Sequence, residues 1–198
     1  MKWESSIVSQ SFYDRDPVIV AQDLLGKFLV RKINDQFIVG RITETEAYLS
    51  SGDSAAHNFK GKTKRNESLY KSGGHAYVHS MRQYCLIDAV TESSDKPGSV
   101  LIRSVEPVEG IDTMKKNRNE KNEDNLTNGP GKVCAAFNIT RQLDGVDLTN
   151  FREGLFISSD ENISQNKITT SSRIGISTAK DMPLRFHLSD SVHVSKKQ

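Results

Sequence analysis

Two runs of β-branched and aromatic residues near the N-terminus constrain the fold most strongly. They read KFLVRKI and QFIVGRITETEAYL, span residues 27–33 and 36–49, and flank the turn-forming pair Asn34-Asp35. This arrangement predicts an antiparallel hairpin. Side chains alternate between the two faces of a strand, so one face of the second run carries Ile42, Glu44, Glu46 and Tyr48. That face therefore gathers two carboxylates and an aromatic ring.

The remaining regular elements are short, and most are strands. HAYVHSM and QYCLIDAVT predict a second hairpin at 75–91, and further strands are expected at SVLIRSVEP, LFISS, RIGIS and LRFHLS. Helices are expected from Pro17 to Leu25, between a capping Asp16 and Gly26, and after the glycine turn of TNGPGKVCAAFNI. Strands without regularly interleaved long helices predict an α+β fold on a mixed, mainly antiparallel sheet.

The chain length predicts a single compact domain over 1–198, because 198 residues bury one sizeable core. We expect flexible ends at about 1–10 and 196–198. The very polar segment 111–125 predicts an exposed helix or a mobile insert. A formal net charge of +2 is too small to indicate a partner, so any nucleic-acid argument rests on where basic residues cluster.

The sequence argues against disulfides, metal sites and covalent nucleophiles, and against a secreted or membrane location. Cys85 and Cys134 stand far apart and form neither a disulfide framework nor a CxxC zinc pair. The five histidines lack HExxH spacing and no GxSxG elbow occurs, so we expect no metal and no covalent serine or cysteine nucleophile. No apolar run has the length of a signal peptide or a membrane span, which predicts a cytoplasmic protein with no membrane partner. The functions that remain are hydrolysis in which a carboxylate is the catalytic group, or binding.

The two glutamates have two interpretations. Glutamates on a strand commonly face solvent, but Ile42 and Tyr48 on the same face indicate that at least one carboxylate is partly enclosed. Enclosure raises the pKa of a carboxyl group toward working pH and makes it a candidate general base. The alternation does not distinguish Glu44 from Glu46 in this role.

Basic residues cluster further along the chain, again with two interpretations. The loop HNFKGKTKRNESLYK, with Lys64 and Arg65 at its centre, is either a solvated loop or a phosphate-binding surface. Lys132 in NGPGK lies in a plain turn or contacts a DNA phosphate, and the motif is not the P-loop pattern. His57, which opens the loop, fits a catalytic, a base-contacting or a packed role.

Several short motifs occur in one order along the chain: GRITETEAYL, AAH ending at His57, KTKRN, GGHAYV, VLIRSVEPVEG, LTNGPGKVCAAF, DLT, RIGI and PLRF. They resemble the methylpurine (alkyladenine, 3-methyladenine) DNA glycosylase family from about Tyr13 to Ser195. The resemblance implies a domain with a protruding hairpin and a monofunctional hydrolase that acts as a monomer without cofactor. Its partner is duplex DNA, from which it flips alkylated or deaminated purines of the 3-methyladenine, 7-methylguanine and hypoxanthine class. It then hydrolyses the N-glycosidic bond, in base excision repair.

The resemblance also implies residue roles. The catalytic glutamate falls on Glu46, and Arg103 helps to hold the attacking water. The carbonyl of Ile176 is a further candidate contact for that water. The tyrosine that stacks on the flipped base falls on Tyr48, and His57 lines the opposite side of the base pocket.

The predicted hairpin departs from the family pattern. YVHSMRQYCLID is about two residues shorter, His79 replaces a second tyrosine of the base pocket, and the tyrosine that fills the vacated stack is missing. Met81 or Arg82 is therefore the expected wedge. The family asparagine that discriminates among purines falls on Ile87 or Asp88. The further DNA contacts expected are Tyr77, Lys64, Arg65 and Lys132.

Two alternatives stay open. One is a catalytically weak protein that binds damaged DNA, because the altered hairpin fails to hold a base flipped. The other is a nucleoside or glycoside hydrolase that uses Glu44 and Glu46 as a pair. No lysine occupies a matching nucleophile position, so neither a Schiff base nor strand cleavage is expected.

Overall fold

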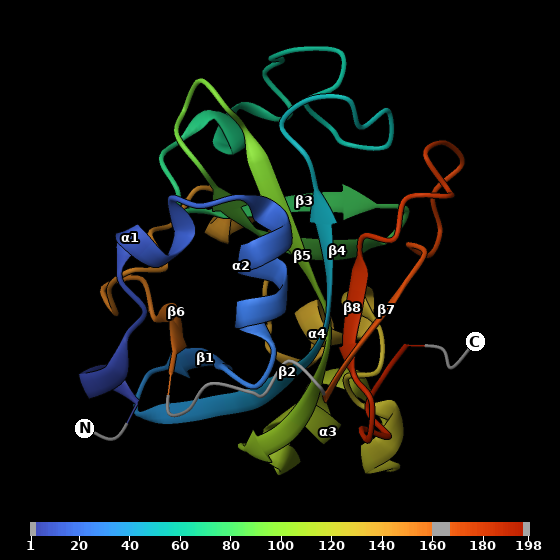
Figure 1. The fold of residues 1–198 in the computed structure, drawn as a ribbon. Helices are drawn as coiled ribbons and strands as arrows, with labels where there is room; N and C mark the ends of the chain where they lie inside the picture. The colour runs from blue at the N-terminus through green and yellow to red at the C-terminus, as the bar shows by residue number, and fades with distance from the viewer. Residues whose placement is uncertain (1–2, 160–166, 196–198) are drawn as a thin grey trace.

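Eight strands form one curled sheet (Figure 1). The structure is a computed structural model that describes residues 3–159 and 167–195. The sheet follows the order β3-β4-β5-β2-β1-β6, and β8 pairs with both β2 and β7, every one of these pairings being antiparallel. The strands span Phe28–Ile33 (β1), Gln36–Tyr48 (β2), Ala76–Met81 (β3), Tyr84–Thr91 (β4), Gly98–Glu109 (β5), Leu155–Ser158 (β6), Ile168–Ser171 (β7) and Arg185–Leu188 (β8).

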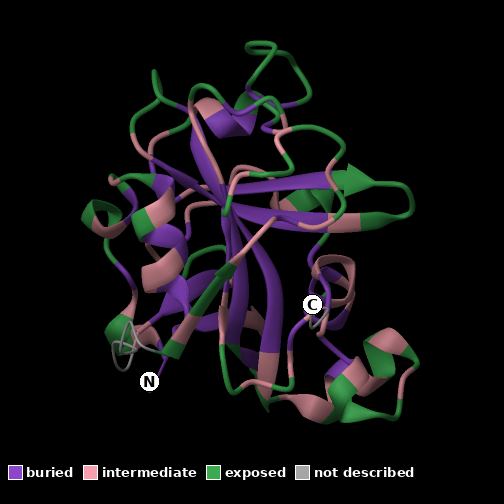
Figure 2. Cartoon of the chain, turned by 45° about the vertical axis from the view of Figure 1, so that its right-hand side comes forward, coloured by how far each residue is buried: buried purple, intermediate pink, exposed green. Residues whose placement is uncertain are grey.

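Both predicted hairpins are confirmed, and residues with positive φ form their turns. β1 pairs with β2 around Asn34, and β3 pairs with β4 around Arg82, each with φ of +55°. The β3–β4 hairpin runs outward from the sheet to an exposed tip (Figure 2). The predicted helix is also confirmed as α2, Pro17–Leu24, where the side chain of Asp16 accepts a hydrogen bond from the Val18 N–H at 2.8 Å.

Short helices close the core around the sheet. α2 packs against β2, where the Thr45 hydroxyl donates to the Ala21 carbonyl at 2.8 Å. Gly40 allows a close approach on β2, since a Cβ there would lie 2.5 Å from the Val105 side chain. The other helices are α1 (Gln10–Tyr13), α3 (Ile111–Arg118) and α4 (Pro130–Ala136), with 3-10 turns at Glu4–Ser6, Glu67–Tyr70, Glu123–Asn125 and Arg141–Leu143. The result is a single α+β domain, as predicted.

The RIGIS segment at 173–177 is not a strand, contrary to the prediction. Gly175 has φ of +81°, and the Ile174 N–H donates to the carboxylate of Glu46 instead of to a neighbouring strand. The strand in this region is β7, which ends at Ser171. The loop that follows β7 therefore reaches the polar face of β2.

The N-terminal segment is packed, whereas residues 1–10 were expected to be flexible. Trp3 and Val8 are buried, and the Trp3 ring centroid lies 4.9 Å from that of Phe28. Residues 1–2 and 196–198 lie outside the described residues. Burial of these apolar side chains ties the described part of the N-terminus to the sheet.

The polar segment 111–125 contains regular structure. Residues 111–118 form α3, which buries Met114, and Asn119 ends the helix with φ of +47°. The helical alternative for this part of the segment is therefore correct. In the part of the chain that the structure describes, no helix combines the length and hydrophobicity needed to cross a membrane.

Candidate active site

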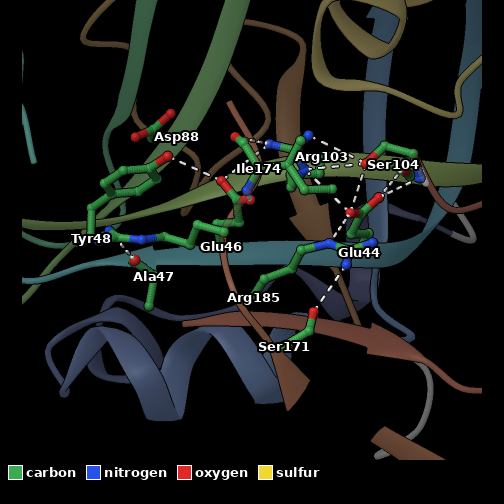
Figure 3. A network of polar contacts seen from close by, with 12 residues as sticks. Glu44, Glu46, Ala47, Tyr48, Asp88, Arg103, Ser104, Ser171, Ile174 and Arg185 are labelled. Carbon is green, nitrogen blue, oxygen red and sulfur yellow. Dashed lines mark hydrogen bonds and ion pairs between the residues drawn. The ribbon is translucent and has the colours of Figure 1, made fainter. Parts of the chain in front are cut away.

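The candidate residues meet near the end of β2 (Figure 3). β2 supplies Glu44, Glu46 and Tyr48, β5 supplies Arg103, and the loop after β7 supplies Ile174. The pairing of β2 with β5 shifts register on both sides of Glu44, which marks a β-bulge. Bulges of this kind re-aim side chains. Both carboxylates contact the guanidinium of Arg103, which shows that they share one face, as predicted.

Glu44 is fully buried, and its carboxylate is saturated with donors. Oε1 accepts hydrogen bonds from Arg185 Nε at 2.6 Å, the Ser195 hydroxyl at 2.7 Å and Arg103 Nε at 3.2 Å. Oε2 accepts from the Ser104 hydroxyl and the Ser195 N–H, both at 2.6 Å. Burial alone would raise the pKa of Glu44, but Arg103 and the hydrogen bonds together lower it. Glu44 is held as a carboxylate whose acceptor positions are occupied.

Glu46 is equally buried but has fewer partners. The Ile174 N–H donates to Oε1 at 2.7 Å, the Tyr48 hydroxyl donates to Oε2 at 3.0 Å, and Arg103 Nη1 lies 3.1 Å from Oε2. Burial has the largest effect and raises the pKa of Glu46, while Arg103 and the hydrogen bonds offset part of that effect. A raised pKa suits a group that takes up a proton near neutral pH.

Arg103 links these carboxylates to the loop after β7. It is buried, and its Nη1 lies 3.5 Å from the Ile174 carbonyl. The predicted residue Ile176 lies two positions further along and is half-buried, and the contacts to Glu46 and Arg103 come from Ile174. The backbone of Ile174 therefore offers a donor and an acceptor beside Glu46.

A buried ion pair backs the ring of Tyr48. Arg173 donates two hydrogen bonds to Asp53, at 2.6 and 2.7 Å, and its guanidinium carbon lies 4.6 Å from the Tyr48 ring centroid. The next residue, Ile174, donates to Glu46, so the ion pair positions the ring and the loop together. The sequence interpretation missed Arg173 and Asp53. Arg173 stands in the RIGI motif, but nothing in the spacing joined it to an aspartate so far away.

His57, Tyr77 and His79 form an aromatic cluster. Nδ1 of His57 lies 2.9 Å from the Tyr77 hydroxyl, and the His57 and His79 rings meet edge to face with centroids 4.6 Å apart. Tyr77 and His79 stack at 4.9 Å. Burial is the largest effect that lowers the pKa of His57, which keeps this ring neutral at pH 7. Tyr77 is only 2% exposed, so it supports the two histidines from inside the protein.

A narrow pocket separates Tyr48 from this cluster. Of the two hairpin positions left open by the sequence, Asp88 reaches the pocket, whereas Ile87 is buried in the main core. Asp88 accepts a hydrogen bond from the Ser99 hydroxyl at 2.9 Å. The residues lining the pocket are Tyr48, His57, His79, Asp88, Ser99 and Leu101. The pocket thus has aromatic walls and a polar group on the sheet.

The predicted wedge and loop residues lie on the surface. Met81 is 49% exposed, and Arg82 is exposed at the tip of the β3–β4 hairpin. Lys64 and Arg65 are exposed in the loop between β2 and β3. Arg65 also lines a wider hollow that shares His57 and His79 with the narrow pocket. Basic side chains therefore border the aromatic cluster.

Lys132 differs from these cations because it is tied within the protein. It is half-buried, and its Nζ donates to the side-chain oxygens of Asn125 and Asn128. Its neighbour Gly131 packs against Tyr84, since a Cβ there would lie 3.0 Å from the tyrosine ring. The NGPGK turn therefore docks α4 against the hairpin.

The described residues contain no group of three or more His, Cys, Asp or Glu side chains arranged to hold a metal ion. Both cysteines are free, and burial raises the pKa of the Cys134 thiol well above its usual range, which leaves it unreactive. The ionisable side chains that line the pocket include His57, His79 and Asp88, and Glu46 adjoins it through the hydrogen bond from Tyr48. This arrangement places a carboxylate that can accept a proton one hydrogen bond away from a pocket with aromatic walls.

Known proteins resemble this chain over nearly its full length. Residues 11–192 match the family described as methylpurine-DNA glycosylase (MPG). The chain is 42% identical to a protein of Carboxydothermus hydrogenoformans, covering 96% of this chain and 100% of the relative. Relatives from Clostridium novyi (41% identical, 96% and 98% covered) and Staphylococcus saprophyticus (44%, 93% and 92%) are similarly close. All three carry the name "Putative 3-methyladenine DNA glycosylase". The chain therefore belongs to the methylpurine-DNA glycosylase family.

Proposed function

We propose that this chain is a monofunctional DNA glycosylase, a hydrolase that excises alkylated or deaminated purines from duplex DNA in base excision repair. Its substrates are purines of the 3-methyladenine, 7-methylguanine and hypoxanthine class. One observation carries the proposal: the buried carboxylate of Glu46 accepts a hydrogen bond from the hydroxyl of Tyr48, at 3.0 Å, where Tyr48 forms a wall of the pocket. A proton acceptor thus stands beside a pocket with aromatic walls. Family membership and the names of the relatives point to the same activity.

The residues that line the pocket suit stacking against a damaged purine that has been flipped out of the duplex. Tyr48 supplies one aromatic wall, and His57 and His79 supply the other. An alkylated purine is cationic and electron-poor, so it stacks favourably on aromatic faces. Because His57 is neutral at pH 7, it adds no charge that would repel such a base.

Glu46 and Arg103 perform the hydrolysis in this proposal. A water molecule beside Glu46 is oriented by Arg103 and by the backbone of the loop after β7, for which Ile174 and Ile176 are the candidates. Glu46 takes a proton from the water as the water oxygen attacks the anomeric carbon. The N-glycosidic bond breaks, and its electron pair leaves with the purine. The negative charge of Glu46 also stabilises the oxocarbenium-like sugar. Within residues 3–159 and 167–195, the groups in contact with Glu46 include no lysine amine, which favours simple hydrolysis without a lyase step.

The exposed hairpin and the basic loop provide the DNA contacts. Met81 or Arg82 fills the space that the flipped nucleotide leaves, because both protrude at the hairpin tip. Lys64 and Arg65 contact phosphates, whereas Tyr77 acts through the histidines that it supports. We propose that the protein acts as a monomer in the cytoplasm, where bacterial DNA resides.

The paired-carboxylate alternative is disfavoured by the surroundings of Glu44. That mechanism needs two carboxyl groups, roughly 5–9.5 Å apart, on either side of one substrate. Arg103 contacts both glutamates, and the acceptor positions of Glu44 are occupied by protein donors. Only Glu46 adjoins the pocket residue Tyr48 through a hydrogen bond.

Excision is tested with a duplex that carries one hypoxanthine or one 3-methyladenine. After incubation with the protein, hot alkali converts abasic sites into strand breaks. Breaks at the lesion that depend on both protein and alkali are the expected result. Breaks without alkali would indicate a lyase step, and lesion binding without any breaks would support the alternative of a protein that only binds damaged DNA.

A further inference from the structure

The Arg173–Asp53 ion pair lies behind Tyr48, outside the set of residues that line the pocket. Both side chains are fully buried, and Nη1 and Nη2 of Arg173 donate to the two oxygens of Asp53 at 2.6 and 2.7 Å. This two-bond geometry is the most specific that an arginine makes with a carboxylate. Taking both charges out of water costs free energy, so a buried pair is weak evidence of a purely stabilising role.

The pair also holds the end of β2. Nη1 of Arg173 donates to the carbonyl of Ala47 at 3.0 Å, and the guanidinium carbon lies 4.6 Å from the Tyr48 ring centroid. Asp53 accepts a hydrogen bond from the N–H of Leu49 at 3.1 Å. One ion pair therefore ties together the end of β2, the loop that follows it and the loop after β7.

These contacts fix the two hydrogen-bond donors of Glu46. Ile174 follows Arg173 in the chain, and its N–H donates to Oε1 of Glu46 at 2.7 Å. Tyr48 follows Ala47, and its hydroxyl donates to Oε2 at 3.0 Å (Figure 3). Each donor is thus adjacent in sequence to a residue of the contact network around the guanidinium.

The proton affinity of Glu46 depends on these two donors. Burial is the largest effect on its pKa and raises it, and the charge of Glu44 raises it further. The charge of Arg103 and the hydrogen bonds from the two donors lower it. Arg185 of β8 contacts the carboxylate of Glu44. Loss of a donor would therefore raise the pKa of Glu46 and restrict its basic form to higher pH.

We infer that Arg173 and Asp53 are positioning residues for the proposed hydrolysis. Their ion pair keeps both donors, the Ile174 N–H and the Tyr48 hydroxyl, on the carboxylate of Glu46. This inference rests on the proposed function and adds what sets the pH range in which the base can accept a proton from water. The planar guanidinium is required, because it contacts Asp53, the backbone of β2 and an aromatic ring at once.

The test is Arg173→Lys, which keeps the charge and removes the planar fork. The pH profile of kcat/KM is measured for hypoxanthine in a synthetic duplex or 3-methyladenine in methylated duplex DNA, whichever base the unmodified protein releases faster. The acidic limb should move to higher pH, because Glu46 loses a donor. The loss of kcat/KM should be about tenfold larger below the midpoint of that limb than on the plateau. A role confined to folding would lower kcat/KM by the same factor at every pH.

Arg15→Lys is the matched control. Arg15 donates to Asp23 at 2.9 Å, and its guanidinium carbon lies 4.5 Å from the Phe12 ring centroid. It therefore has an acidic partner and a ring partner, as Arg173 does, but its partners lie outside the set of residues that line the pocket. The acidic limb should stay in place in this variant.

An acidic limb that Arg173→Lys leaves in place, or a loss by the same factor at every pH, would overturn the inference but not the proposed function. Failure of the unmodified protein to release either base would overturn both. Circular dichroism establishes whether the variant folds. Should it not fold, Asp53→Asn is the second variant, because it keeps the size of the side chain and removes the charge that holds the guanidinium. The acidic limb should again move to higher pH, and an unmoved limb would overturn the inference.

Discussion

Glu44 and Glu46 lie two residues apart on β2, but their surroundings differ in how far each carboxylate is left able to act on a substrate. Both are fully buried, and both contact Arg103. The pKa of Glu44 is lowered because its many donors outweigh burial, whereas the pKa of Glu46 is raised because burial outweighs its few partners. Two carboxyl groups whose pKa values are pushed apart are typical of an acid–base site. The saturated carboxylate serves structure, and the less saturated one stays available to a substrate.

The largest expected effect is that of Glu46→Gln. The amide keeps the size of the side chain but cannot act as a base, so excision should fall by at least about a hundredfold. Lesion binding should persist, because the pocket walls are unchanged. Single-turnover excision and a gel-shift assay measure the two quantities. Retained excision in this variant would show that the base lies elsewhere.

Glu44→Gln should instead act mainly on stability. Removing the charge takes away the carboxylate that the buried guanidinium groups of Arg103 and Arg185 share, which costs about 3 kcal/mol in the free energy of unfolding. For a domain of this size the melting temperature should fall by about 10 °C. Excision by the folded variant should stay within about tenfold of the unmodified protein.

The matched control for this variant is Glu106→Gln. Glu106 forms an exposed ion pair with Arg41 at 3.8 Å, and such pairs contribute little. Its melting temperature should not change measurably. If Glu44→Gln abolished excision while Glu46→Gln retained it, the assigned roles of the two glutamates would have to be exchanged.

The pH dependence separates the same two groups. The folded pKa of Glu44 lies below the usual 4.5, so its stabilising contribution is present above that value and is lost as the pH falls through the folded pKa. The folded pKa of Glu46 lies above 4.5, and this group acts as a base only when deprotonated. Excision should therefore decline on acidification at a higher pH than unfolding does. Parallel measurements of kcat/KM and circular dichroism check this order, and coincident midpoints would contradict it.

Much of this site follows from strand periodicity. Alternation along β2 predicted that Glu44 and Glu46 share a face, and their common partner Arg103 bears this out. Alternation alone left the two glutamates equivalent, and the resemblance singled out Glu46. The distinction depends on Ser195 and Arg185, which approach Glu44 from the far end of the chain. Contacts at such sequence separation leave no local pattern.

The loop after β7 marks the limit of pattern-based prediction. RIGIS has the apolar alternation of a strand, yet the Arg173–Asp53 ion pair and the Ile174–Glu46 hydrogen bond hold it in an irregular conformation. Tertiary contacts overrode the local preference, as they commonly do for short strands. The position of Asp88 was undetermined for a related reason, because only the register of the β3–β4 hairpin decides whether Ile87 or Asp88 reaches the pocket.

The same contrast, between side chains held by hydrogen bonds within the protein and side chains open to a partner, applies to the basic residues. Substitutions there should have the smallest effect of those predicted. Lys132 donates to Asn125 and Asn128, whereas Lys64 is exposed in the loop between β2 and β3. Lys64→Ala should weaken binding to undamaged and damaged duplexes alike, by about threefold, and reduce the slope of binding against salt by about 1. Lys132→Ala should leave that slope unchanged. The slopes are measured by titration at several salt concentrations. A reduced slope for Lys132→Ala alone would mean that the NGPGK turn contacts phosphate despite its internal hydrogen bonds. The number of hydrogen bonds within the protein would then predict which carboxylate of β2 can act on a substrate, but not whether this cation can bind DNA.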